Sequence, residues 1–285
     1  MSTSTEEVDH KVGETEGRAR NLSGWQLRLV AVVAFSWSLF QLWYASPLPF
    51  ILGFGVLIDV PARAVHLGFA LLLAFLSFPF LKKNKNRKFN IFDFGFAAIA
   101  VLCAFYLFYN YEALVYRNGI LLTHDLNLFG RQFNFPTELV IGLFGIGLLL
   151  EATRRAIGTP LVVVAAVFLL YSIFGQSMPE MISHQGLSLN RLIGYHWFGG
   201  EAIFGIPISV SVSFVFLFVL FGSMLDYAGG GRYFLGLALA LVGKFRGGPA
   251  KASILASGLT GMISGSSIAN VVTTGTFTIP IMKKT

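Results

Sequence analysis

The chain has 285 residues, of which 55% are hydrophobic and only 12% are charged. Globular domains contain about 25% charged residues, so this composition excludes an ordinary soluble protein. The net charge of +7 would suit a nucleic-acid partner, but the basic residues stand in short blocks between apolar runs. We therefore attribute the charge to membrane topology, and we expect a lipid bilayer rather than nucleic acid around the protein.

The first 26 residues differ from the rest of the chain because they are polar and carry charges of both signs. A cleaved secretory signal would have an apolar stretch near its start. A segment with so little apolar content cannot bury a core. We predict that residues 1–26 form a disordered cytoplasmic tail and that the first helix after it is an uncleaved anchor.

Six apolar segments follow, and each is predicted to be a transmembrane helix because about 20 apolar residues cross a bilayer. They are 27–44, 64–81, 94–111, 139–150, 160–175 and 204–225. The fourth is short, but its polar ends Thr137, Glu138 and Glu151 can extend it to spanning length. Segment 47–60 is interrupted by prolines and glycines, so we expect an interfacial or re-entrant piece that does not cross.

Positive charge between the segments predicts the orientation. With the N-terminus inside, the cytoplasmic side collects the leader and Arg28, the block 82–88, Arg154, Arg155 and all basic residues after position 230. The outer side keeps four arginines, Arg63, Arg117, Arg131 and Arg191. This asymmetry predicts a multi-pass protein with a cytoplasmic N-terminus.

The stretch 252–282 is uncharged and is bracketed by Lys251 on one side and by Lys283 and Lys284 on the other. The lysines at both ends should lie on the cytoplasmic side, and the roughly 30 residues between them are too few for two membrane crossings. We therefore predict a re-entrant hairpin of two half-length helices. Segment 233–242, just before it, is predicted to be an amphipathic helix along the inner surface.

Small and hydroxylated residues gather in the middle of this hairpin. Our candidate residues for ion and substrate binding are Ser264, Gly265, Ser266, Ser267, Ala269, Asn270, Thr273, Thr274 and Gly275. Non-helical backbone at membrane depth must be buried in protein or face a water-filled cavity, where its carbonyl and hydroxyl oxygens can bind sodium. Alternatively, these small residues only allow helices to pack closely.

Motifs for other chemistry are missing from the sequence. The single cysteine, Cys103, lies in an apolar run, and His184 and His196 have no metal-ligand spacing. No ionisable residue is predicted clearly at mid-bilayer, which argues against a proton relay of carboxylates. We expect no catalytic residues, no metal centre and no enzymatic activity.

Three stretches resemble the fused permeases of TRAP (tripartite ATP-independent periplasmic) transporters of the TAXI class. Residues 243–284, GKFRGGPAKASILASGLTGMISGSSIANVVTTGTFTIPIMKK, are similar to the first re-entrant hairpin of the large subunit. Residues 204–225, FGIPISVSVSFVFLFVLFGSML, resemble the helix before that hairpin. Residues 148–158, LLLEATRRAIG, resemble the junction after the small-subunit-like part.

The resemblance implies sodium-driven uptake of small organic anions, such as carboxylates, across the bacterial inner membrane. A periplasmic substrate-binding protein would deliver the substrate, sodium would be the coupling ion, and no cofactor would be needed. The hairpin-bearing domain would make an elevator-like movement. Glu151, Arg154 and Arg155 would then lock the first helices to the transport core, whereas without the resemblance they are interfacial anchors.

The expected fold class is an all-α polytopic membrane protein that forms the first half of an inverted-repeat transporter. We predict a small-subunit-like four-helix region over 27–155 and the start of a large-subunit-like transport domain over 156–285. The family continues with more helices and a second hairpin, so these 285 residues alone are not expected to transport. The alternatives are another sodium-coupled carrier and a structural membrane subunit.

Overall fold

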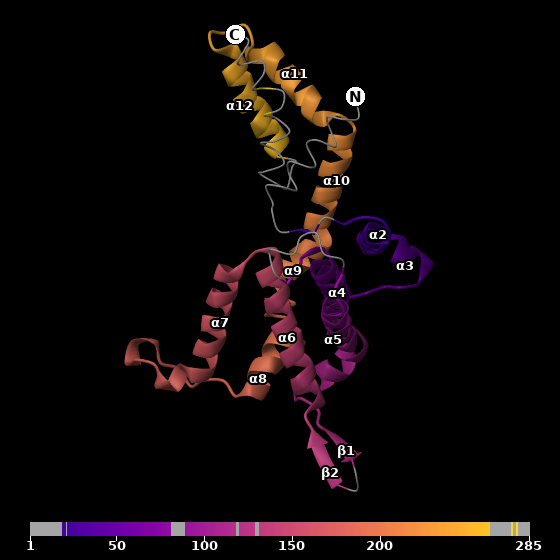
Figure 1. Ribbon diagram of the computed structural model, residues 1–285, viewed down its shortest axis with the longest axis vertical. Coiled ribbons are helices and arrows are strands. Elements are labelled where there is room, and N and C mark those ends of the chain that lie inside the picture. The colour runs from indigo at the N-terminus through magenta and orange to yellow at the C-terminus, as the bar shows by residue number, and fades with distance from the viewer. Residues whose placement is uncertain are drawn as a thin grey trace. The chain divides into compact units, whose positions relative to one another are not determined.

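The computed structural model describes residues 19–20, 22–80, 89–117, 120–128, 131–262, 275 and 278. Most of them are helical, as Figure 1 shows, which confirms the all-α polytopic class. Five helical segments within this part of the chain are long and apolar enough to cross a membrane. They are Trp25–Ala45, Val60–Ser77, Ile91–Tyr116, Thr159–Ser177 and Ile206–Leu225. The first three are helices α2, α4 and α5.

Helix α6, Thr137–Ala156, is the short fourth segment of the sequence. Its 20 residues give a length of about 30 Å at 1.5 Å per residue, which matches the hydrocarbon core. Its acidic and basic residues lie in its first turn and its last two turns, so its middle is apolar. As predicted, the helix reaches spanning length only when its polar ends are included.

The segment between α2 and α4 does not contain a crossing. It forms helix α3, Leu48–Leu52, which has five residues and is far too short to span. Two glycines with positive φ, Gly53 and Gly55, then turn the chain back, and the Trp43 indole donates to the Gly55 carbonyl. Helix α4 begins four residues earlier than predicted because Pro61 suits the first turn of a helix.

Helices α4, α5 and α6 form the centre of the first compact unit, which holds the described residues from 19 to 213. Helix α7, Thr159–Phe174, packs on the other side of α6. It is followed by short helices α8, Leu189–Ile193, and η4, a π-helical turn over Gly194–Phe198. Trp197 of η4 is fully buried against α6, so this aromatic segment belongs to the core.

A two-stranded antiparallel hairpin connects helix α5 to helix α6. Strand β1 is His124–Leu128 and strand β2 is Arg131–Phe135, with His124 paired to Phe135. Polar and apolar residues alternate along β1 from Asp125 and along β2 from Gln132, and this period of two is typical of strands. In Figure 1 the hairpin extends beyond the ends of α5 and α6.

The last transmembrane segment is made of three parts: α9, Ile206–Val210, the π-helical turn η5, Ser211–Val215, and α10, Phe216–Tyr227. The boundary between the two compact units falls inside it, after residue 213. In the second unit, helix α11, Gly230–Val242, packs along helix α12, Gly248–Gly261. The buried residues at their contact are the alanines Ala238, Ala252 and Ala256, and such small residues let the two helices approach closely.

Two glycines of α6 allow a matched test of the first core. A Cβ atom added to Gly145 would lie 2.4 Å from the Trp197 ring, whereas one added to Gly147 would meet nothing within 4 Å. We expect Gly145→Ala to lower the free energy of unfolding by about 1–3 kcal/mol through overpacking. Gly147→Ala should be neutral or stabilising by up to about 1 kcal/mol, since alanine favours helix. Thermal unfolding of the detergent-solubilised variants measures both, and equal shifts would contradict the packing described.

Candidate functional site

The predicted hairpin tip lies mostly outside the described residues. This holds for Ser264, Gly265, Ser266, Ser267, Ala269, Asn270, Thr273 and Thr274. Gly275 is described, and it is helical and half-buried. The structure therefore locates the approach to the tip, which is α12, and the binding roles of these residues stay predictions.

Helix α12 has the length and the start expected of a half-helix. Its 14 residues extend for about 21 Å, less than a full crossing. It begins after Gly247, whose φ of +72° is left-handed, and Pro249 lies in its first turn. The Thr260 hydroxyl donates to the Ala256 carbonyl within the helix, so this buried hydroxyl is already satisfied.

A buried ion network joins the start of α5 to the end of α6. Arg155 Nη1 lies 2.7 Å from Asp93 Oδ1, and the Arg20 guanidinium bonds the other oxygen of the same carboxylate. The Arg155 side chain is 0% exposed and that of Asp93 3% exposed. The Asn90 backbone N–H also donates to Asp93, within a capping box at the start of α5. Charges this deeply buried are stable only when they are paired in this way.

Glu151 extends this network along α6. Its carboxylate accepts from Arg155 Nε at 2.8 Å and from Arg154 Nε at 2.7 Å. Around the Arg155 guanidinium lie the rings of Phe75, Phe80 and Phe96, at 4.9, 5.3 and 5.4 Å from their centroids. A planar cation between aromatic faces gains additional stabilisation in a desolvated site.

These contacts bear on the two interpretations of Glu151, Arg154 and Arg155. Arg155 is buried, so it does not act as a solvent-facing anchor, whereas Arg154 is partly exposed and donates to the Phe80 carbonyl. Their partners lie in and just after α4 and at the start of α5, and Asp93 links them to Arg20 before α2, so the network ties the first helices to one another. A role in coupling to the transport core stays a prediction.

A second buried carboxylate joins α5 and α6 at their opposite ends. Glu138, with a side chain that is 0% exposed, is held by Arg117 through two hydrogen bonds of 2.7 and 3.1 Å. It also accepts from the Tyr106 hydroxyl at 3.0 Å and from the Leu122 backbone N–H at 2.6 Å. Four donors thus satisfy this carboxylate and fix the base of the β-hairpin.

A histidine inside α4 forms a polar cluster that sequence reasoning missed. His66 Nδ1 accepts from the Trp37 indole at 3.2 Å and from the Gln41 amide. Its Nε2 then donates to Ser211 Oγ at 3.1 Å, which requires the neutral ring. The cluster connects α2 and α4 to the first residue of the π-helical turn η5.

The sequence contains a signal for only some of these buried polar groups. The Asn-x-x-Asp spacing of Asn90 and Asp93 is a capping-box pattern at a helix start. Nothing in the sequence pairs Asp93 with Arg20 or Arg155, which stand 73 and 62 positions away. Among the described residues, no three His, Cys, Asp or Glu side chains are grouped so as to hold a metal ion.

Comparison with known proteins assigns the second half of the chain. Residues 144–285 match the family model of the tripartite ATP-independent periplasmic transporter, DctM component. This part of the chain belongs to that family, and the protein is a multi-pass membrane protein that carries TRAP permease sequence. Members of this family are transporter permeases that work with a periplasmic binding protein.

The chain is also similar to the uncharacterized protein YgiK of Salmonella typhimurium, with 29% identity over 153 residues. The alignment covers 54% of this chain and 31% of that relative. The chain thus matches about a third of the length of this curated relative. No solved structure matches the chain.

The ion network can be tested against an exposed ion pair of the same protein. Asp93→Asn leaves the buried Arg20 without its anion and leaves Arg155 with Glu151 alone, and we expect a loss of about 3–5 kcal/mol in unfolding free energy. The control is Asp59→Asn, because Asp59 is exposed in its pair with Arg63 and should cost about 1 kcal/mol or less. Denaturant unfolding in detergent compares the two. Equal losses would show that the network does not stabilise the fold.

Proposed function

We propose that this chain is the N-terminal portion of a fused TRAP permease of the TAXI class. The whole permease would import small organic anions such as carboxylates, driven by sodium and supplied by a periplasmic binding protein. The observation that carries this proposal is the DctM match over 144–285, preceded by helices that share a core with the matched region. Phe75 of α4, Leu107 of α5 and Trp197 of η4 are all buried in that core.

The two compact units suit the elevator movement that the family implies. In this proposal the unit up to residue 213 is the static scaffold, and the unit from 214 onward carries the hairpin. The boundary falls within a single transmembrane helix, at η5, and π-helical turns are frequent at functional sites. His66 holds Ser211 at the scaffold side of this turn.

Sodium is proposed to bind at 264–270. A helix that enters at Gly248 and extends for about 21 Å passes the middle of a hydrocarbon core about 30 Å thick. Exposed Lys251 and the turn with Lys244 and Arg246 keep its start near a membrane surface. The residues after α12 would then offer backbone carbonyls and hydroxyls near the midplane, where an uncharged oxygen cage suits sodium.

The sodium proposal predicts different effects for three tip variants of the full-length permease, reconstituted with its binding protein. Gly265→Leu and Asn270→Leu should abolish sodium-dependent uptake while the protein still inserts, because the larger leucine side chain would fill the proposed sodium site. Ser266→Ala should raise the sodium concentration for half-maximal uptake about tenfold, if one ligand worth about 1.4 kcal/mol is lost. Ser253→Ala is the control, since this hydroxyl already donates to the Ala250 carbonyl of α12. Unchanged sodium dependence in all tip variants would favour simple helix packing.

The proposed location is the bacterial inner membrane with a cytoplasmic N-terminus. Single cysteines at Lys85 and Arg191, in a Cys103→Ala background, test this with an impermeant thiol reagent on intact cells. We expect labelling at position 191 and protection at position 85, because positive charge is retained inside. The reverse pattern would invert the topology.

A further inference from the structure

A groove of about 410 Å³ runs between α5 and α6. Seven side chains of α5 between Ile99 and Asn110 line it, together with Val140, Ile141 and Phe144 of α6. The rim faces away from the core, since Leu102, Phe105, Tyr109 and Phe144 are exposed. The groove is therefore open on the outward face of helices α5 and α6.

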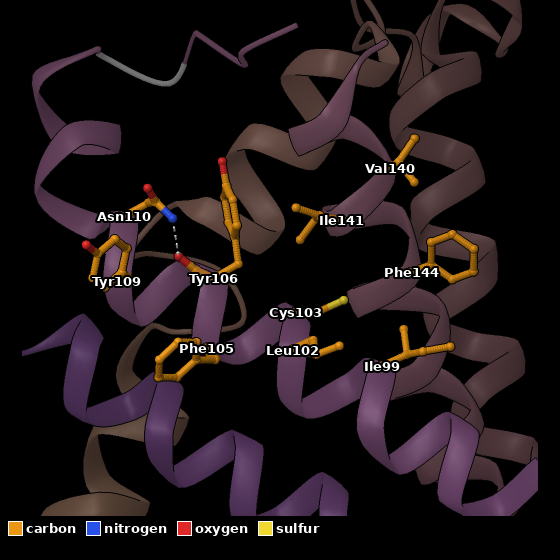
Figure 2. A pocket seen from close by; sticks show the side chains of 10 residues that line it. All are labelled: Ile99, Leu102, Cys103, Phe105, Tyr106, Tyr109, Asn110, Val140, Ile141 and Phe144. Atoms are coloured by element: carbon orange, nitrogen blue, oxygen red, sulfur yellow. Dashed lines mark hydrogen bonds between the residues drawn. The ribbon is translucent and has the colours of Figure 1, made fainter. Parts of the chain in front are cut away.

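Different side chains lie at the two ends of the groove, as Figure 2 shows. Tyr106, Tyr109 and Asn110 lie at one end, where the Asn110 amide donates to the Tyr106 carbonyl at 3.1 Å. Ile99 and Phe144 lie at the other end. Cys103, a small side chain, lies between the two ends and leaves the space that a larger residue would fill. The walls of the groove are almost entirely apolar, because Tyr106 and Asn110 direct their polar groups to Glu138 and to the α5 backbone, so a ligand that fits it is a narrow apolar chain.

The length of the groove corresponds to one leaflet. From Ile99 to Asn110 the α5 helix rises about 16 Å, and half of a hydrocarbon core measures about 15 Å. The end of the groove at Asn110 lies next to Tyr111, where the apolar segment 94–111 ends. The end at Ile99 lies just beyond the midpoint of that segment. A transmembrane helix of a partner would instead need a groove through the whole bilayer.

We propose that this groove binds one acyl chain of a phospholipid from the surrounding bilayer. The chain lies along Leu102, Cys103 and Phe144, and the glycerol end of the lipid lies beside Tyr109 and Asn110, in the leaflet on the Arg117 side. The groove is continuous with the lipid-facing surface of α5, so a phospholipid enters it sideways. This site is separate from the proposed sodium site and does not depend on it.

Photo-cross-linking in nanodiscs tests this proposal. The lipid probe is a phosphatidylethanolamine that carries a diazirine within one acyl chain. After irradiation, mass spectrometry of peptides locates the cross-links. We expect labelling of 99–110 and 140–144 to exceed that of exposed Phe168 on α7 at least fivefold and to saturate at low probe fraction. Labelling of Phe168 should rise in proportion to the probe, as it does for passing lipids.

A variant whose groove is filled by a larger side chain distinguishes a lipid bound in the groove from residues that merely react readily with the probe. Cys103→Phe should reduce the groove labelling at least fivefold and leave Phe168 unchanged, whereas Val164→Phe, on the exposed face of α7, should leave the groove labelling intact. Groove labelling in the wild-type protein that is no stronger than at Phe168, or does not saturate, overturns the proposal. A photoreactive amino acid at Leu102 that cross-links to another polypeptide also overturns the proposal, because a protein partner then occupies the site.

Discussion

The buried carboxylate of Asp93 is the point on which the first unit depends. Two arginines from distant parts of the chain, Arg20 and Arg155, converge on it in a site that is almost closed to solvent. Each charge would be strongly unfavourable there alone, so the network forms as a whole or not at all. This constraint fixes the start of α5, the end of α6 and the entry to α2 relative to one another.

Glu138 imposes a similar constraint at the other end of the same helix pair. Arg117 and Tyr106 from the α5 side meet it at the start of α6. Helices α5 and α6 are thus clamped by an ion pair at each end, and their middle does not need to be tightly packed. The groove lies along that middle, between the two clamps.

Helix α6 uses its other face for close packing. Gly142 leaves room for Ile193 of α8 and Gly145 for Trp197 of η4, because a Cβ atom at these positions would lie 2.3 and 2.4 Å from those side chains. This contact joins the helices of the DctM-matched region to the same core as α4 and α5. The matched region therefore begins inside the first compact unit rather than at its border, although the domain boundary predicted at 155 remains a prediction.

The sequence alone determined the membrane class, because apolar length acts locally and needs no partner. The six crossings and the grouping of loops by side are predictions from the same local signals, apolar length and positive charge. The sequence also predicted that 47–60 does not cross and that α6 needs its polar ends. The residues chosen for the ion site came from composition and resemblance, and most of them lie outside the described part of the chain.

Tertiary structure decided the partners of Asp93, Glu138 and His66, since burial and pairing of polar groups depend on which helices come together. It also decided that Trp197 belongs to the core and that 124–135 forms a hairpin, because aromatic burial and strand pairing depend on contacts that no single segment contains.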